Sequence, residues 1–65
     1  MATYQVIFTA EAEFAVEVEA ESDYEAIEKF RDDEVDWNTI VSTGNWLPAY
    51  VENPAEGEIE SAELL

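Results

Sequence analysis

The sequence of 65 residues predicts one α+β domain. We expect an antiparallel sheet, made of a β-hairpin plus one or two further strands, with one helix packed on one face, in the order ββαβ(β). Three observations predict this fold: residues 3–9 are β-branched and aromatic, residues 10–21 alternate with period two, and residues 22–25 form a helix-capping box. A domain of this length buries only about 60% of its unfolded surface, so its core is thin.

Residues 3–9 predict the first strand because Val, Ile, Thr, Tyr and Phe favour a pleated, half-buried surface. One face of this strand carries its bulky apolar residues, Tyr4, Val6 and Phe8, while Ile7 lies on the other face. We place the hairpin turn near residues 9–12. This stretch contains no Asn-Gly or Asp-Gly pair, so the register of the hairpin stays open.

Residues 10–21 predict the second strand. Its even positions are all apolar: Ala10, Ala12, Phe14, Val16, Val18 and Ala20. Its odd positions are acidic except for one alanine: Glu11, Glu13, Ala15, Glu17, Glu19 and Glu21. A helix would spread these glutamates around its circumference, whereas a strand places them in one row. We expect this row on the sheet face that points away from the helix.

A helix over about residues 23–33 should follow, with Ser22 as its N-cap and Glu25 completing the capping box. Its apolar stripe holds Tyr24, Ala26, Ile27 and Phe30. The two basic residues have helical partners, Glu25 for Lys29 and Glu28 for Arg31. Together the strands and the helix predict a core of nine residues: Tyr4, Val6, Phe8, Phe14, Val16, Val18, Tyr24, Ile27 and Phe30.

The second half of the chain is less regular. Residues 39–43 are strand-like, Gly44-Asn45 predicts a turn, and residues 46–51 predict an edge strand or a loop because they contain a proline. Asn53-Pro54 predicts another turn, and residues 57–65 favour a strand over a helix that starts at an Asn53 cap. The large aromatic residues of this half, Trp37, Trp46 and Tyr50, are expected to complete the core rather than to form a contact patch.

The composition excludes several kinds of chemistry. The chain has no Cys and no His, which removes disulfides, thiol chemistry and the commonest general base. Paired carboxylates need a desolvating cleft to act as acid and base, and so small a domain has little room for one, so we expect no enzyme. Asp32, Glu34, Asp36 and Asn38 alternate oxygen ligands, but Trp37 and Thr43 stand where a calcium loop requires Gly and Glu. We therefore expect no metal site and no cofactor.

Charge points to the class of partner. The chain carries 17 acidic residues against 2 basic ones, for a formal net charge of -15. Ordinary protein surfaces mix charges of both signs. Repulsion among so many like charges disfavours the compact state. Alternate residues on one strand face lie about 6.6–6.8 Å apart, similar to successive phosphates of a nucleic-acid strand. The glutamate row, together with the acidic run after the helix, is therefore the candidate partner-binding site: Glu11, Glu13, Glu17, Glu19, Glu21, Asp32, Asp33, Glu34 and Asp36.

One stretch also resembles a known family. Residues 16–22 read VEVEAES and residues 23–30 read DYEAIEKF, and from residue 4 to about residue 34 the chain resembles the small DpnD/PcfM-like domains. The resemblance implies a strand followed by a helix and an origin in mobile elements, and it implies no site residues. In size and charge the whole chain resembles the small acidic inhibitors of phages and mobile elements, including DNA-mimicking anti-CRISPR and anti-restriction proteins.

These observations lead to a functional hypothesis of a non-enzymatic, anti-CRISPR-like inhibitor that mimics DNA. Its partner would be a basic nucleic-acid-binding complex, such as a CRISPR effector at its PAM-binding surface, a restriction enzyme or a nuclease. We expect no direct binding to nucleic acid or membrane, no signal peptide, and a location in the cytoplasm of the host cell of a phage or mobile element. Two alternatives stay open: a halophile-type acidic domain, and an acidic partner or chaperone of a basic protein.

Overall fold

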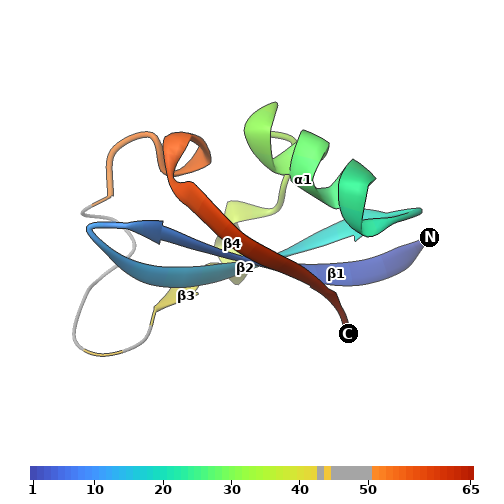
Figure 1. Cartoon of the computed structure of the whole chain (residues 1–65), viewed down its shortest axis with the longest axis horizontal. Helices are drawn as coiled ribbons and strands as arrows, with labels where there is room; N and C mark the ends of the chain where they lie inside the picture. The colour runs from blue at the N-terminus through green and yellow to red at the C-terminus, as the bar shows by residue number, and fades with distance from the viewer. Residues whose placement is uncertain (43, 45–50) are drawn as a thin grey trace.

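The computed structural model describes residues 1–42, 44 and 51–65. It contains a four-stranded antiparallel sheet in the order β3-β2-β1-β4, with one helix on one face (Figure 1). The helix α1 spans Asp23–Arg31, and the strands are β1 (Ala2–Ala10), β2 (Ala12–Ala20), β3 (Val41–Ser42) and β4 (Glu58–Leu64). The predicted α+β class is therefore confirmed, with two strands after the helix.

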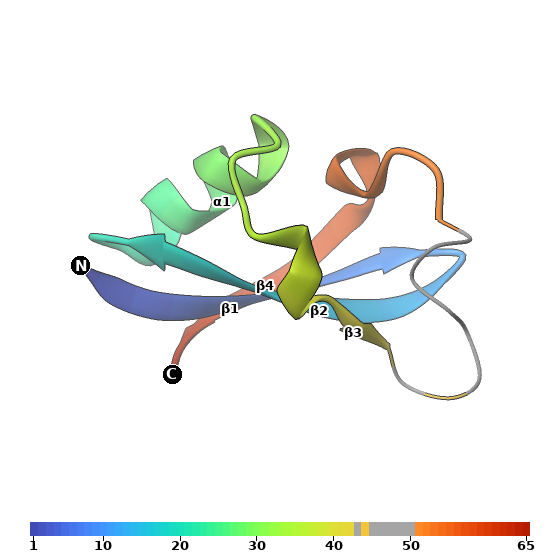
Figure 2. The same ribbon diagram turned by 180° about the vertical axis from the view of Figure 1, so that it is seen from behind.

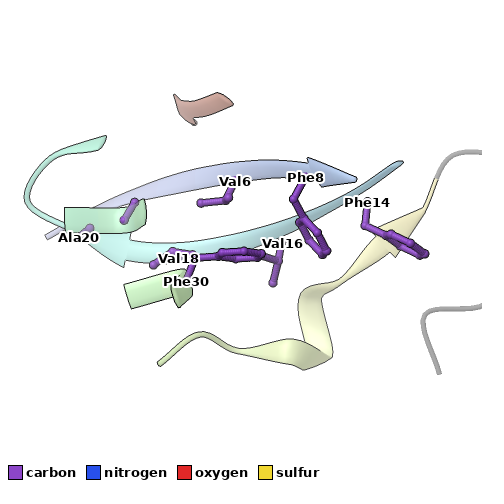
Figure 3. Packing of buried hydrophobic residues seen from close by; sticks show 8 residues of the cluster. Val6, Phe8, Phe14, Val16, Val18, Ala20 and Phe30 are labelled. Atoms are coloured by element: carbon purple, nitrogen blue, oxygen red, sulfur yellow. The ribbon is translucent and has the colours of Figure 1, made fainter. Parts of the chain in front are cut away.

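β1 and β2 form the predicted hairpin, paired from Ala2↔Ala20 to Ala10↔Ala12. Glu11 alone connects them, and its φ of 70° lies in the left-handed region. The even residues of both strands face α1, so they supply most of the core (Figure 3). The buried cluster contains Val6, Phe8, Phe14, Val16, Val18, Ala20, Ala26 and Phe30.

The core differs from its prediction on the helix. Tyr24 is 68% exposed, and Ile27 is only half-buried, whereas Ala26 and Phe30 are buried. Successive helical residues are 100° apart, so Ala26 and Phe30 lie within about 40° of each other, while Tyr24 lies about 160° from Ala26. The helix is centred on Ala26 because its small side chain lets the helix approach the sheet closely, and Tyr24 then points to solvent.

The helix begins as predicted and ends earlier. Ser22 Oγ accepts a hydrogen bond from the Glu25 backbone N–H at 3.2 Å, whereas the Glu25 carboxylate accepts one from the Glu21 N–H rather than from that of Ser22. The last helical residue is Arg31, not a residue near 33. Asp33 adopts a φ of 63°, and the Glu34 N–H donates to the Lys29 carbonyl at 2.8 Å. These contacts form a Schellman motif with Asp at the position that usually holds Gly.

After the helix the chain runs back along the edge of β2 that does not pair with β1. A short 3-10 turn, η1 (Trp37–Thr39), precedes β3, and both lie beside β2 (Figure 2). Within the strand predicted over residues 39–43, residues 41 and 42 form β3, whereas Thr39 belongs to η1, and residue 43 lies outside the described residues. Trp37 is half-buried, with its ring edge-on to Phe30 at 5.7 Å between centroids, which confirms its place beside the core.

The chain then reaches β4 through a second 3-10 turn, η3 (Pro54–Glu56), on the same side of the sheet as α1 (Figure 1). Asn53 precedes η3 with a φ of 50°, which confirms the turn at Asn53-Pro54. The favoured strand over residues 57–65 is confirmed as β4, which pairs with β1 through one bulge. The predictions for Asn45, Trp46, Tyr50 and most of residues 46–51 lie outside the described residues.

Candidate functional site

The strongest feature of the surface is the sheet face that points away from α1, called the outer face here. In β2 the glutamates Glu13, Glu17 and Glu19 are exposed on this face, while the residues between them, except Ala15, are buried towards α1. Glu11 in the turn and Glu21 just beyond β2 are also exposed. The period-two pattern thus gives the expected orientation, and we call these five glutamates the β2 row.

A second acidic row lies on the other side of β1. The register pairs Glu58 of β4 with Thr9 and Glu63 with Gln5, so both glutamates share the outer face with these β1 residues. Glu60 joins them at the bulge, where its Oε2 accepts a hydrogen bond from Thr9 Oγ1 at 2.9 Å. Sequence reasoning missed this β4 row (Glu58, Glu60 and Glu63) because alternation does not reveal which strands become neighbours.

The two rows meet at one point. Thr9 is paired with Glu13 on one side and hydrogen-bonded to Glu60 on the other. A hydrogen bond with Glu60 and repulsion by its negative charge raise the pKa of Glu13 above its ordinary value of 4.5. The outer face therefore holds carboxylates close enough to repel one another, and a cationic partner would relieve that repulsion.

Both basic side chains have hydrogen-bond partners other than the carboxylates of the outer face, although Lys29 lines one groove together with Glu17 and Glu19. Lys29 Nζ donates to the Glu19 carbonyl oxygen at 2.8 Å and forms an ion pair with Glu25 at 3.5 Å, as predicted. Arg31 was expected to pair with Glu28, but its Nη1 donates to the carbonyl oxygens of Ala55 and Gly57, each at 2.7 Å. Because these two side chains donate to carbonyl oxygens and to Glu25, neither forms an ion pair with a carboxylate of the outer face.

The acidic run after the helix divides into two kinds of residue. Asp33 and Asp36 serve the local structure: Asp33 Oδ1 accepts from Trp37 Nε1 at 2.6 Å, and Asp36 Oδ1 accepts from the Asn38 N–H at 3.0 Å. Asp32 and Glu34 are exposed, and no hydrogen bond to either carboxylate is found among the described residues. Among the described residues of this run, Asp32 and Glu34 are thus the two whose carboxylates give up no local hydrogen bond when they bind a partner.

Two shallow grooves connect these acidic residues. One, of about 550 Å³, runs along the edge of β2 and brings Glu34 and Asp36 together with Glu17 and Glu19 of the β2 row. The other, of about 540 Å³, lies at the hairpin end, where its acidic lining residues are Glu11, Glu52, Glu56 and Glu58. Asp32 and Asp33 line neither groove.

The described parts of the chain show no group of three or more acidic side chains placed to hold a metal ion. Within the same parts, no helix is long and apolar enough to cross a membrane. Comparison of the sequence and the structure with protein-family models, curated proteins and solved structures gave no match.

Proposed function

We propose that this chain is a non-enzymatic inhibitor that mimics nucleic acid and occupies the basic DNA-binding channel of a nuclease or a CRISPR effector complex. The observation that carries the proposal is the outer face, where the β2 row and the β4 row flank the neutral strand β1. Neither basic side chain of the sequence neutralises these rows.

The dimensions of the outer face support this proposal. Glutamates two residues apart on β2 repeat every 6.6–6.8 Å or so along the strand. Because β1 separates the two rows, their backbones lie about 10 Å apart, twice the usual distance between strands. A DNA duplex likewise presents two rows of phosphates across grooves of about 6 and 12 Å. A protein channel that fits phosphates at such spacings would find carboxylates at similar places.

The conformation of Glu11 is a further support. A left-handed φ costs a residue with a side chain about 1–2 kcal/mol relative to glycine. Glu11 nevertheless occupies the hairpin turn with a φ of 70°, its side chain exposed. Strained backbone positions cluster at binding sites, and no helix-ending motif accounts for Glu11 as it does for Asp33, so its conformation supports a binding role.

Charge complementarity would mainly speed association and orient the complex, and salt would weaken it. The experiment uses the tagged chain as bait in a bacterial lysate that contains CRISPR and restriction complexes, at low and high salt. We expect capture of a nucleic-acid-binding complex at low salt and its release by duplex DNA.

Two variants make this experiment specific. Glu17→Lys with Glu19→Lys reverses two charges of the β2 row and should abolish capture. Asp23→Lys with Glu28→Lys changes the net charge equally, at exposed positions of α1 outside both rows and both grooves, and should preserve most of the capture. If the folded row variant captures the same complex as wild type, the proposal is wrong.

A further inference from the structure

The two edges of the sheet differ in how many of their outward backbone groups have hydrogen-bond partners. At the β2 edge, β3 pairs with Phe14 and Ala15, Thr39 Oγ1 accepts from the Glu17 N–H at 3.0 Å, and Lys29 caps the Glu19 carbonyl oxygen. At the β4 edge, the described residues provide no strand or side chain that pairs with the outward backbone groups. The described residues thus close the β2 edge and leave the β4 edge open.

The register identifies the open groups of β4. The Leu65 N–H donates to the Thr3 carbonyl oxygen at 2.9 Å, so Leu65 points its backbone towards β1. In an antiparallel pair such residues alternate with residues whose N–H and C=O point the other way. Leu64 and Ala62, which stand opposite Tyr4 and Val6, therefore direct their backbone groups to the open edge.

This open segment lacks most of the usual protection of an edge. Natural edges are blunted by Lys, Pro, bulges or short strands. β4 has seven residues and no Lys or Pro, and its bulge lies before Ser61, so residues 61–64 are regular. Its remaining protection is negative charge, from Glu60 and Glu63, which repels a second copy of this acidic chain but attracts a cationic strand.

The two faces of β4 specify the strand that would fit. Glu63 and Glu60 are on the outer face, whereas Ala62 packs against the core and Leu64, on that same side, is 64% exposed. A strand beside β4 would place alternate side chains against each face. It would therefore need cationic residues opposite the glutamates and apolar residues opposite Leu64.

We propose that the open edge of β4 binds an extended segment of a protein partner, with alternating cationic and apolar residues, as a fifth antiparallel or parallel strand. Main-chain hydrogen bonds at Ala62 and Leu64 would supply affinity, and the alternating side chains would supply specificity. The proposal rests on the proposed function only for its partner, since a basic DNA-binding protein is the natural source of such a segment.

The test uses the full chain labelled with ¹⁵N and an end-capped peptide of alternating Lys and Val. A peptide with the same residues in two blocks, all Lys and then all Val, controls for charge. We expect the alternating peptide to slow amide hydrogen exchange at Ala62 and Leu64 and the block peptide to leave it unchanged. Equal effects of the two peptides, or no protection at these two amides, would overturn the proposal.

Ala62→Pro removes one outward N–H without touching the ladder with β1, so it should weaken binding of the alternating peptide about tenfold, the loss of one hydrogen bond. Leu64→Pro is the second variant should Ala62→Pro fail to fold, and Leu64→Val is its matched control. Unchanged peptide binding by a folded proline variant contradicts the proposal. Protection of the Ala62 amide that rises with protein concentration in the absence of peptide also contradicts it, because the occupant would then be a second copy of the chain.

The two proposals fail separately. Glu17→Lys with Glu19→Lys lies on the opposite side of β1 and should still bind the alternating peptide at the β4 edge. If the peptide fails to protect Ala62 while duplex DNA still displaces the captured complex, the strand proposal is wrong and the proposed function stands. If the peptide binds and no DNA-sensitive complex is captured, the proposed function is wrong.

Discussion

At the scale of single residues, the backbone strain at Glu11 lowers stability while its carboxylate belongs to the proposed binding site. Glycine adopts a left-handed φ of 70° without steric strain, so Glu11→Gly should raise the free energy of unfolding by about 1 kcal/mol. Glu11→Ala removes the same charge but keeps the side-chain carbon, and should gain much less. Urea unfolding measures both. Equal stabilisation by the two variants would show that charge, not backbone strain, sets the energy of this turn.

The carboxyl pair of Glu13 and Glu60 predicts a pH dependence. Because the pKa of Glu13 is raised in the folded state, the folded chain binds a proton more tightly than the unfolded chain does. Stability from this group is thus present below the ordinary glutamate pKa and is lost as pH rises through the raised value. Glu60→Gln removes the repulsion and should flatten this part of the stability curve.

Urea unfolding at several pH values from 4 to 7 tests this prediction. The matched control is Glu28→Gln, which removes one exposed charge on α1, across the sheet from the pair. The comparison between the two variants is the decisive one. A Glu60→Gln curve that parallels the Glu28→Gln curve would contradict the assigned coupling.

At the scale of elements, Arg31 connects the helix to the start of β4 through the carbonyl oxygens of Ala55 and Gly57. Arg31→Gln should lower the free energy of unfolding by about 1–2 kcal/mol, since hydrogen bonds from a charged donor are the stronger ones but this side chain is exposed. Hydrogen exchange at Gly57 and Ile59 should speed up. Exchange that is faster throughout the sheet but not selectively there would contradict this local role.

The same elements show what sequence reasoning can reach. Period-two alternation is a local pattern, so it predicted β2, its buried face and the β2 row. The β4 row depends on which strands pair and on a bulge opposite Ile7 and Phe8, and neither is encoded locally. The partners of Arg31 lie 24 and 26 residues away in sequence, so helical spacing suggested Glu28 instead. The helix has two apolar sides, one with Tyr24 and one with Ala26 and Phe30, and local spacing does not tell which of them packs on the sheet.

At the scale of the whole molecule, the net charge of -15 fits both a mimic and a halophilic domain, and the salt dependence of folding distinguishes the two. Lys is scarce, as halophilic adaptation favours, but Glu outnumbers Asp 13 to 4. We expect the chain to be folded at ordinary ionic strength, because both basic side chains and the buried aromatic core stabilise it without added salt. Circular dichroism during a salt titration measures this. A chain that folds only in molar salt would favour halophilic adaptation.

The acidic outer face and its two rows are the basis of the central claim, namely that this chain and DNA compete for one surface of the target. The most direct measurement is the apparent Kd between the chain and the captured complex at increasing concentrations of duplex DNA. Competition predicts that the apparent Kd rises in proportion to DNA concentration and that the two ligands never bind together. A ternary complex of chain, target and DNA, with an unchanged Kd, would contradict mimicry and identify the chain as an acidic partner that binds elsewhere.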